Sequence, residues 1–146
     1  MKPKHFEIAE RFLGLDEHKN TKILDNYFKK QCNWNFSVKT TPWCAAFVNA
    51  TLAEAGLPIT GSFMARSFLK YGKPVTKPQT GDIVVFKRGA PPSGHVAYYV
   101  KNHDADYIVV LGGNQKDEVC MKLYRKDSIL GYRRPWLASR RVFKFN

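Results

Sequence analysis

The sequence predicts an α+β domain whose helices come first and whose antiparallel sheet follows. Apolar residues recur at helical spacing in the first half of the chain, and from Gly81 onward short apolar runs alternate with turn residues. The 146 residues, 44% of them hydrophobic, are enough for one core and exclude a disordered or collagen-like chain. We therefore expect a single domain, 1–146, in which about five strands pack on a buried helix.

The helical half contains four candidate helices, at residues 6–13, 23–28, 41–56 and 62–71. The third, TPWCAAFVNATLAEAG, has the clearest ends. Thr41 suits the N-cap, Pro42 the first helical position and Gly56 the C-terminal stop. Its small apolar residues predict a helix that is buried against a sheet. Residues 31–40 are expected to form a loop, so an N-terminal helical part spans about 1–35.

The second half contains five apolar runs bounded by Gly, Pro, Asn or Asp, which predict strands. They are residues 82–86, 95–100, 107–111, 119–124 and 129–134. A turn near Asp104 joins the second strand to the third, so these two should form a hairpin. Folding about that turn places His95 roughly opposite Gly113, to within a residue or two.

Positive charge dominates the composition. Lys and Arg number 24 and Asp and Glu 12, so the formal net charge is +12. Such a balance favours polyanionic partners, among them nucleic acid, anionic lipid and an acidic cell envelope, and does not choose among them. The basic C-terminal tail 137–146 adds to this charge and is either a contact surface or a solvated face.

The number and spacing of the cysteines predict free thiols. Cys32, Cys44 and Cys120 are odd in number and lack CxxC spacing, which fits neither a disulfide framework nor a tetrahedral zinc site. No apolar run reaches the roughly 18 residues of a membrane span, and the N-terminus lacks the apolar stretch of a secretory signal. We therefore expect a soluble protein that is made in a reducing cytosol and needs no metal or cofactor.

Cys44 is the first candidate catalytic residue. With Thr41 as the cap it would be the third helical residue, where free backbone N–H groups and the helix dipole stabilise an anion. This setting would lower a thiol pKa from about 8.5 toward neutrality, as a nucleophile requires. The alternative is a buried structural cysteine.

His95 and Asn114 are the second and third candidates. His95 begins a predicted strand after the flexible stretch GAPPSG, where an imidazole can face a cleft and act as a general base. The hairpin brings Asn114 within one step of it, where an amide could fix the imidazole tautomer, with Gln115 in reserve. The other histidines, His5, His18 and His103, are expected to be exposed.

Two further side chains are candidates for substrate contacts. Trp43, beside the thiol, would either line a substrate cleft or pack in the core. Arg66 would either bind a carboxylate or cap a helix end. The spacing leaves both choices open, and it leaves open whether Gln115 also contacts substrate.

Six blocks in this order resemble the NlpC-type and CHAP (cysteine, histidine-dependent amidohydrolase/peptidase) enzymes of bacterial cell walls, in particular a compact branch common in phage genomes. The blocks are TPWCAAFVNATLAEAG, ARSFLKYG, GDIVVF, GHVAYYV, VLGGNQ and ILGYRRP, within about residues 40–135. The resemblance implies a papain-like α+β fold with Cys44 as nucleophile, His95 as base and Asn114 as orienting residue. The chain departs from CHAP enzymes that carry an acidic residue where it has Gly112.

The resemblance also implies a substrate. It points to a monomeric peptidoglycan hydrolase that cuts an amide bond in the stem peptide, or alternatively to an N-acetylmuramoyl-L-alanine amidase with the same triad. Without a signal peptide the enzyme would reach the periplasm or wall through a holin-type pore, as an endolysin does, or as an injected effector or virion-associated lysin. A different class, a non-enzymatic basic protein that binds nucleic acid or an anionic envelope, remains open.

Overall fold

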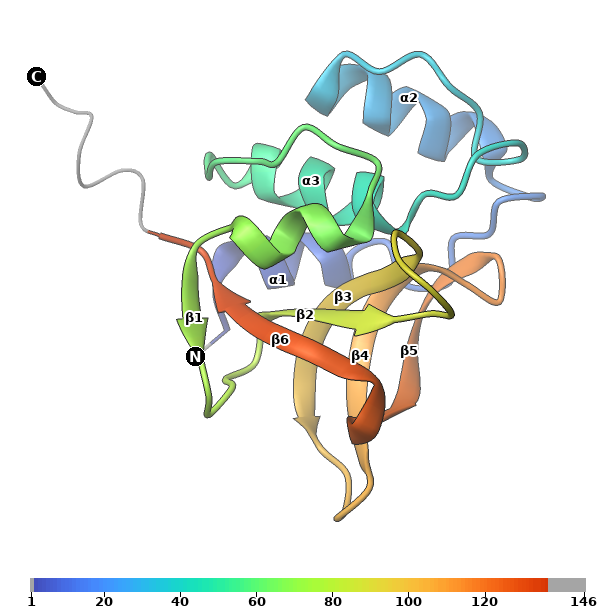
Figure 1. Cartoon of the computed structure of the whole chain (residues 1–146). Coiled ribbons are helices and arrows are strands. Elements are labelled where there is room, and N and C mark those ends of the chain that lie inside the picture. Colours follow the sequence, from blue (N-terminus) through green and yellow to red (C-terminus); the bar gives the residue numbers. More distant parts are fainter. Residues whose placement is uncertain (1, 137–146) are drawn as a thin grey trace, which may run out of the picture.

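The computed structural model describes residues 2–136 and confirms the α+β class (Figure 1). The helices are α1 (Lys4–Glu10), α2 (Thr21–Cys32) and α3 (Cys44–Glu54), with the 3-10 helices η1 (Ala65–Lys70) and η2 (Lys126–Ser128). The strands are β1 (Lys73–Val75), β2 (Ile83–Lys87), β3 (Gly94–Asn102), β4 (Tyr107–Gln115), β5 (Glu118–Arg125) and β6 (Ile129–Arg134). The predicted basic tail 137–146 lies outside the described residues.

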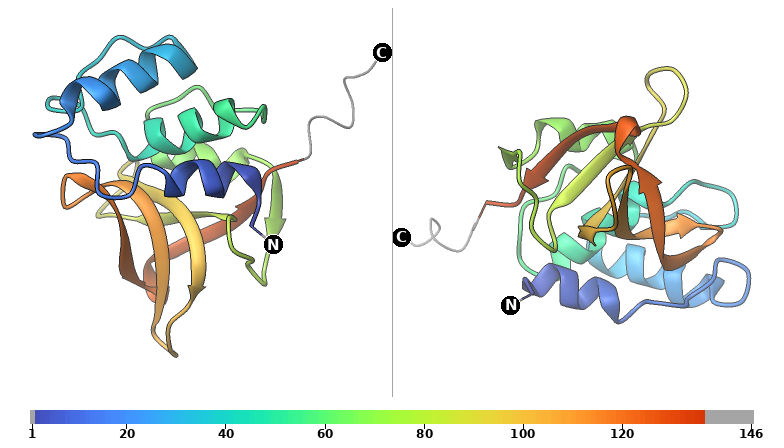
Figure 2. Two further views of the ribbon diagram at one scale, coloured as in Figure 1. Left: turned by 180° about the vertical axis from the view of Figure 1, so that it is seen from behind. Right: turned by 90° about the horizontal axis from the view of Figure 1, so that it is seen from below.

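The strands form one six-stranded antiparallel sheet in the order β1-β6-β2-β3-β4-β5. The prediction of about five strands missed β1, whose three residues pair with the end of β6 and are too few to show a strand period. The two views of Figure 2 show that the sheet is strongly curled, with β2 and β6 crossing β3, β4 and β5.

Curling gives the sheet two buried faces. On one face, side chains such as Val96 and Tyr98 pack against the helices in the larger core. On the other, Phe86, Ala97 and Val110 form a second cluster between β2 and the strands that it crosses. Because side chains alternate along a strand, His95 lies on the side of this second cluster and Val96 on the helix side. The strand β3 therefore connects the two cores.

The helix α3 is buried between the sheet and α2, as predicted (Figure 1). It begins two residues later than predicted, because Trp43 has non-helical angles (φ −127°, ψ 19°) and no side chain caps the helix. Cys44 is therefore its first residue and not its third. The helix ends as predicted, with Gly56 in the left-handed region at φ +79°.

Buried polar groups of α3 are satisfied by neighbouring segments. The Asn49 side chain accepts a hydrogen bond from the Thr60 backbone N–H at 2.8 Å and donates to the Ser62 carbonyl at 3.0 Å. The Thr51 hydroxyl lies 2.7 Å from the Tyr98 hydroxyl on β3. Since unpaired buried polar groups destabilise a fold, these bonds fix α3 against β3 and the 57–64 loop.

Two predictions for the helical part need correction. Residues 62–71 do contain a helix, but it is the six-residue 3-10 helix η1, with i→i+3 bonds such as the one from the Ser67 N–H to the Met64 carbonyl. His5 was expected at the surface and is instead only 5% exposed, because α1 packs on the sheet. Its Nε2–H donates to the Gly81 carbonyl at 2.8 Å, and burial lowers the pKa of its imidazole.

Among residues 2–136, no helix combines the length and the apolar character that crossing a membrane requires.

A partly buried ion pair links the neighbouring strands β2 and β6. Both oxygens of the Asp82 carboxylate accept from the Arg134 guanidinium at 2.8 Å, and one also accepts from the Gln79 backbone N–H. Asp82 is 3% exposed, so removal of its charge would leave a guanidinium without its partner. The pair fixes the start of β2 against the end of β6.

We predict that Asp82→Asn lowers the free energy of unfolding by about 2 kcal/mol, because it weakens a bidentate, charge-assisted pair whose carboxylate is buried. Asp127→Asn is the matched control, since Asp127 pairs with Arg125 at 3.0 Å on the exposed surface. That change should stay within about 0.5 kcal/mol. Urea unfolding measures both, and equal losses would contradict the role given to the Asp82 pair.

Candidate active site

The start of α3 abuts β3 at a point where β3 is free on one side. Among the β3–β4 pairs, the one nearest to the start of β3 is Tyr98 with Leu111. Val96 precedes this pair, so its backbone N–H takes no part in the β3–β4 hydrogen bonding. The Val96 backbone N–H acts on the Cys44 thiol and favours its thiolate form. Cys44 is 7% exposed. The thiol therefore lies near the peptide that joins His95 to Val96.

Burial dominates the electrostatics of the thiol. The pKa of Cys44 is raised, because desolvation outweighs the N–H groups of Val96, Ala45 and Cys44 and the charge of Arg88, all of which favour the thiolate. The expectation that the helix start lowers this pKa toward neutrality was therefore wrong. At neutral pH the resting group is a thiol.

His95 is 1% exposed and lies among aromatic rings. The Tyr124 ring stacks on the imidazole with centroids 5.2 Å apart and an interplanar angle of 17°. Phe86, paired with His95 across β2 and β3, has its ring centroid 6.1 Å away at 28°. These rings hold the plane of the imidazole. Burial, together with the nearby Arg88 and Lys122 charges, lowers the pKa of His95 to about 4, so the imidazole is neutral at pH 7.

The Gln115 amide determines the tautomer of His95. Its Nε2 donates to the Cys120 carbonyl at 2.8 Å, and a carbonyl can only accept, so the amide oxygen faces the imidazole. That oxygen lies 2.9 Å from Nε2 of His95 and can only accept in turn. Nε2 therefore carries the proton, which leaves Nδ1 as the nitrogen able to take a proton from a nucleophile.

A bulge brings Gln115, and not Asn114, to the imidazole. The β4–β5 register shifts between Gly112 and Gln115, and Asn114 has a positive φ of 57°. The β3–β4 register, with Tyr98 opposite Leu111, also differs by one residue from the predicted register. Within the described chain the Asn114 side chain makes no hydrogen bond, while Gln115 is 1% exposed and occupies the place expected for Asn114.

Gly112 makes room for this arrangement. A Cβ at Gly112 would lie 2.6 Å from the Gln115 amide oxygen and 2.9 Å from the Ala97 Cβ. Gly112 is the position at which some CHAP enzymes carry an acidic residue. In this chain the Gln115 amide fills the space that a side chain at 112 would need.

The two residues expected to contact substrate have other contacts. Trp43 is fully buried, packs on Phe28 and Phe47 and donates its Nε1–H to Glu17 at 2.9 Å. It therefore offers no surface to a ligand, and of the two alternatives the structure favours packing. The Nε of Arg66 donates to the Ser93 carbonyl at 2.7 Å. Arg66 thus holds the segment that leads into His95.

Sequence reasoning missed four side chains that surround the imidazole: Phe86, Arg88, Lys122 and Tyr124. Lys122 and Tyr124 are two residues apart on a predicted strand. Because side chains alternate between the two faces of a strand, the sequence could have predicted that they share a face. Arg88 follows β2 and carries no pattern of its own. Only the antiparallel pairing of β2 with β3 brings it near His95.

One group among the described residues has the composition of a metal site. Glu17, His18 and Asp117 offer ligand atoms within 4.8 Å of one another. The His18 Nε2 lies 3.7 Å from Glu17 and 3.6 Å from Asp117, distances that also suit ion pairing at the surface. His18 and His103 are exposed, as predicted. The expectation that the site needs no metal stays a prediction.

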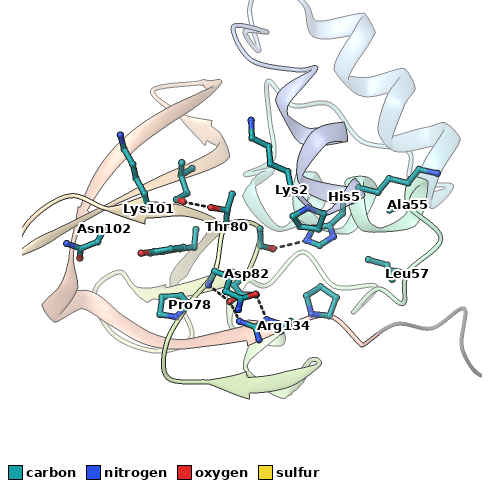
Figure 3. A pocket seen from close by; sticks show the side chains of 17 residues that line it. Lys2, His5, Ala55, Leu57, Pro78, Thr80, Asp82, Lys101, Asn102 and Arg134 are labelled. Atoms are coloured by element: carbon teal, nitrogen blue, oxygen red, sulfur yellow. Dashed lines mark hydrogen bonds and ion pairs between the residues drawn. The ribbon is translucent and has the colours of Figure 1, made fainter.

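A cavity of about 980 Å³ lies at the other end of α3 (Figure 3). Its lining includes His5, Asp82, Arg134 and Leu57 but neither Cys44 nor His95. The ion pair and the His5 hydrogen bond described above thus lie at this cavity. It is separate from the candidate active site.

Comparison with known protein families matches residues 25–114 to the CHAP domain, more than half of the chain. The chain therefore belongs to the CHAP domain family, and the match confirms the family resemblance found in the sequence. CHAP domains are in general peptidoglycan-hydrolysing amidases or peptidases, and membership indicates activity of this type. A search of curated proteins finds no significant match.

We predict that Gln115→Leu lowers kcat on purified peptidoglycan on the order of 100-fold, because the imidazole loses the acceptor that orients it. Leu keeps the burial but removes the hydrogen bond that raises the pKa of His95, so the acid limb of the pH profile should move to lower pH. Release of soluble fragments measures the rate.

Asn114→Gly is the matched control, since glycine adopts the positive φ of this position and removes the whole side chain. Its rate should stay within about threefold of the wild type. A large loss in Asn114→Gly with little loss in Gln115→Leu would assign the orienting role to Asn114 instead.

Proposed function

We propose that the chain is a cysteine-dependent peptidoglycan hydrolase in which Cys44 is the nucleophile, His95 the general base and Gln115 the residue that positions the base. The observation that carries this proposal is the connected set of contacts at the start of α3. The Val96 backbone N–H acts on the Cys44 thiol, and the preceding residue, His95, has its Nε2 bonded to the Gln115 amide oxygen, which leaves Nδ1 without the proton.

The first half of the reaction forms an acyl-enzyme. Nδ1 of His95 takes the thiol proton as the Cys44 sulfur attacks the amide carbonyl, and the carbonyl electrons move to oxygen. The backbone N–H of Cys44, at the open helix start, is available to this oxyanion. When the tetrahedral intermediate collapses, the C–N bond breaks, the imidazolium protonates the leaving amine and a thioester remains.

The second half releases the product. Nδ1 of His95 takes a proton from water as the water oxygen attacks the thioester carbonyl. Collapse of this second intermediate breaks the C–S bond, and the imidazolium returns its proton to the Cys44 sulfur. Gln115 stabilises each imidazolium by accepting the Nε2–H throughout.

The substrate bond proposed is an amide of the stem peptide, with the amide between the sugar and the peptide as the alternative. The net charge of +12 supports an anionic target, because stem-peptide carboxylates and envelope polymers attract a cationic enzyme. A role as a phage endolysin is a proposal that rests on the resemblance to the compact phage branch and on this charge.

We predict that wild-type protein releases new fragments from purified peptidoglycan and that Cys44→Ser releases none, because serine lacks the acidity and nucleophilicity of a thiol. Cys32→Ser, which alters a half-buried thiol on α2, should retain activity. Mass spectrometry of the fragments distinguishes peptide cleavage from amidase cleavage. Equal digestion by wild type and Cys44→Ser would contradict the proposal and leave a basic binding protein as the better account.

We also predict that alkylation of Cys44 by chloroacetamide accelerates as the pH rises above neutrality. The pKa of the thiol is raised and that of His95 is lowered, so the thiolate forms only as the pH increases. The half-buried Cys32, whose pKa is raised to about 11, is a reference thiol on α2 that is measured in the same digest. A rate that is already constant below about pH 6 would indicate a preformed thiolate–imidazolium pair.

A further inference from the structure

The half-buried Tyr124 ring packs against the imidazole of His95. Tyr124 stacks on His95 at 5.2 Å and on Phe86 at 4.6 Å. Its ring is therefore fixed, and groups that bind to Tyr124 are placed at a fixed position relative to His95.

Two cations meet at this tyrosine from different strands. The Nη2 of Arg88, which follows β2, lies 3.4 Å from the Tyr124 hydroxyl. The Nζ of Lys122, two residues earlier on β5, lies 5.2 Å from the centroid of the Tyr124 ring. Arg88 is exposed and Lys122 is half-buried, so both reach solvent at the side of His95.

Neither cation has an acidic partner in the part of the chain that the structure describes. Both lower the pKa of His95, and Arg88 also lowers that of Cys44, so their fields reach the reacting groups. Unpaired positive charge here opposes the imidazolium that the proposed reaction forms. An anion bound beside Arg88 and Lys122 would offset their charges and so favour the imidazolium form of His95.

We propose that Arg88 and Lys122 form a subsite that binds a carboxylate of the substrate next to the scissile amide. This inference rests on the proposed function, because it places the anion beside Cys44. A guanidinium binds a carboxylate through two parallel hydrogen bonds, and an ammonium adds charge without a fixed geometry. Peptide stems with a free carboxylate near the cleaved bond are the class of substrate that this pair fits.

Two small reagents that differ only in charge test the subsite. Iodoacetate and iodoacetamide both form an S–C bond with the Cys44 thiolate and release iodide, but only iodoacetate carries a carboxylate. The measured quantity is the ratio of their rate constants at Cys44, followed by mass spectrometry of the modified peptide. Any effect on thiol acidity or access changes both rates and cancels in this ratio.

The ratio of the iodoacetate rate to the iodoacetamide rate should fall about tenfold in the double variant Arg88→Gln/Lys122→Gln. The reason is that this variant loses the charge-assisted hydrogen bonds to the carboxylate. Lys87→Gln is the control. This variant also removes a positive charge next to Arg88 in the sequence. The charge of Lys87, however, acts on the exposed Asp127 and not on His95. Its ratio should equal that of the wild type.

The same variants are then compared on peptidoglycan whose carboxylates have been converted to carboxamides. Wild type should cut the amidated wall more slowly than the untreated wall, and the double variant should cut both at similar rates. An unchanged reagent ratio, or an equal fall in Lys87→Gln, would overturn the subsite while Cys44 still reacts with iodoacetamide. No reaction of Cys44 with either reagent would overturn the proposed function and the subsite with it.

Discussion

The hydrogen bond between the Gln115 amide and Nε2 of His95 is the interaction on which the site depends. Its direction is determined at the far end of the amide, where Nε2 of Gln115 donates to the Cys120 carbonyl. Two features of the backbone make the bond possible: the bulge before Gln115 and the absence of a side chain at Gly112. The strand pair β4–β5 therefore determines which imidazole nitrogen is the base, although neither strand supplies the nucleophile or the base itself.

Burial and charge act in opposite directions on the reacting groups. Desolvation favours the neutral forms of both Cys44 and His95. Arg88 and Lys122 oppose the imidazolium, and Arg88 also favours the thiolate. The resting site is accordingly a neutral pair whose reactivity depends on what binds beside it. A substrate that supplies a negative charge would favour the imidazolium, and with it the ion pair, only while the substrate is bound.

Much of the fold followed from the sequence because its signals are local. Gly56 ends α3, the turn at Asp104 joins β3 to β4, and the apolar runs became strands close to their predicted bounds. Other features depend on tertiary contacts that no local pattern records. Trp43 adopts non-helical angles, so α3 begins at Cys44. The bulge in β4 brings Gln115 to the imidazole in place of Asn114. His5 is buried because α1 packs on the sheet. Arg88 joins the site only through the pairing of β2 with β3.

The claim that a neutral imidazole, protonated at Nε2 by the contact with Gln115, is the resting base can be measured directly. Nitrogen-15 NMR of the histidine rings distinguishes a protonated from an unprotonated ring nitrogen and follows both with pH. The account predicts that His95 shows a protonated Nε2 and an unprotonated Nδ1 at neutral pH and that it gains a proton only near pH 4. A His95 ring protonated on both nitrogens at neutral pH, or protonated on Nδ1 alone, would contradict it.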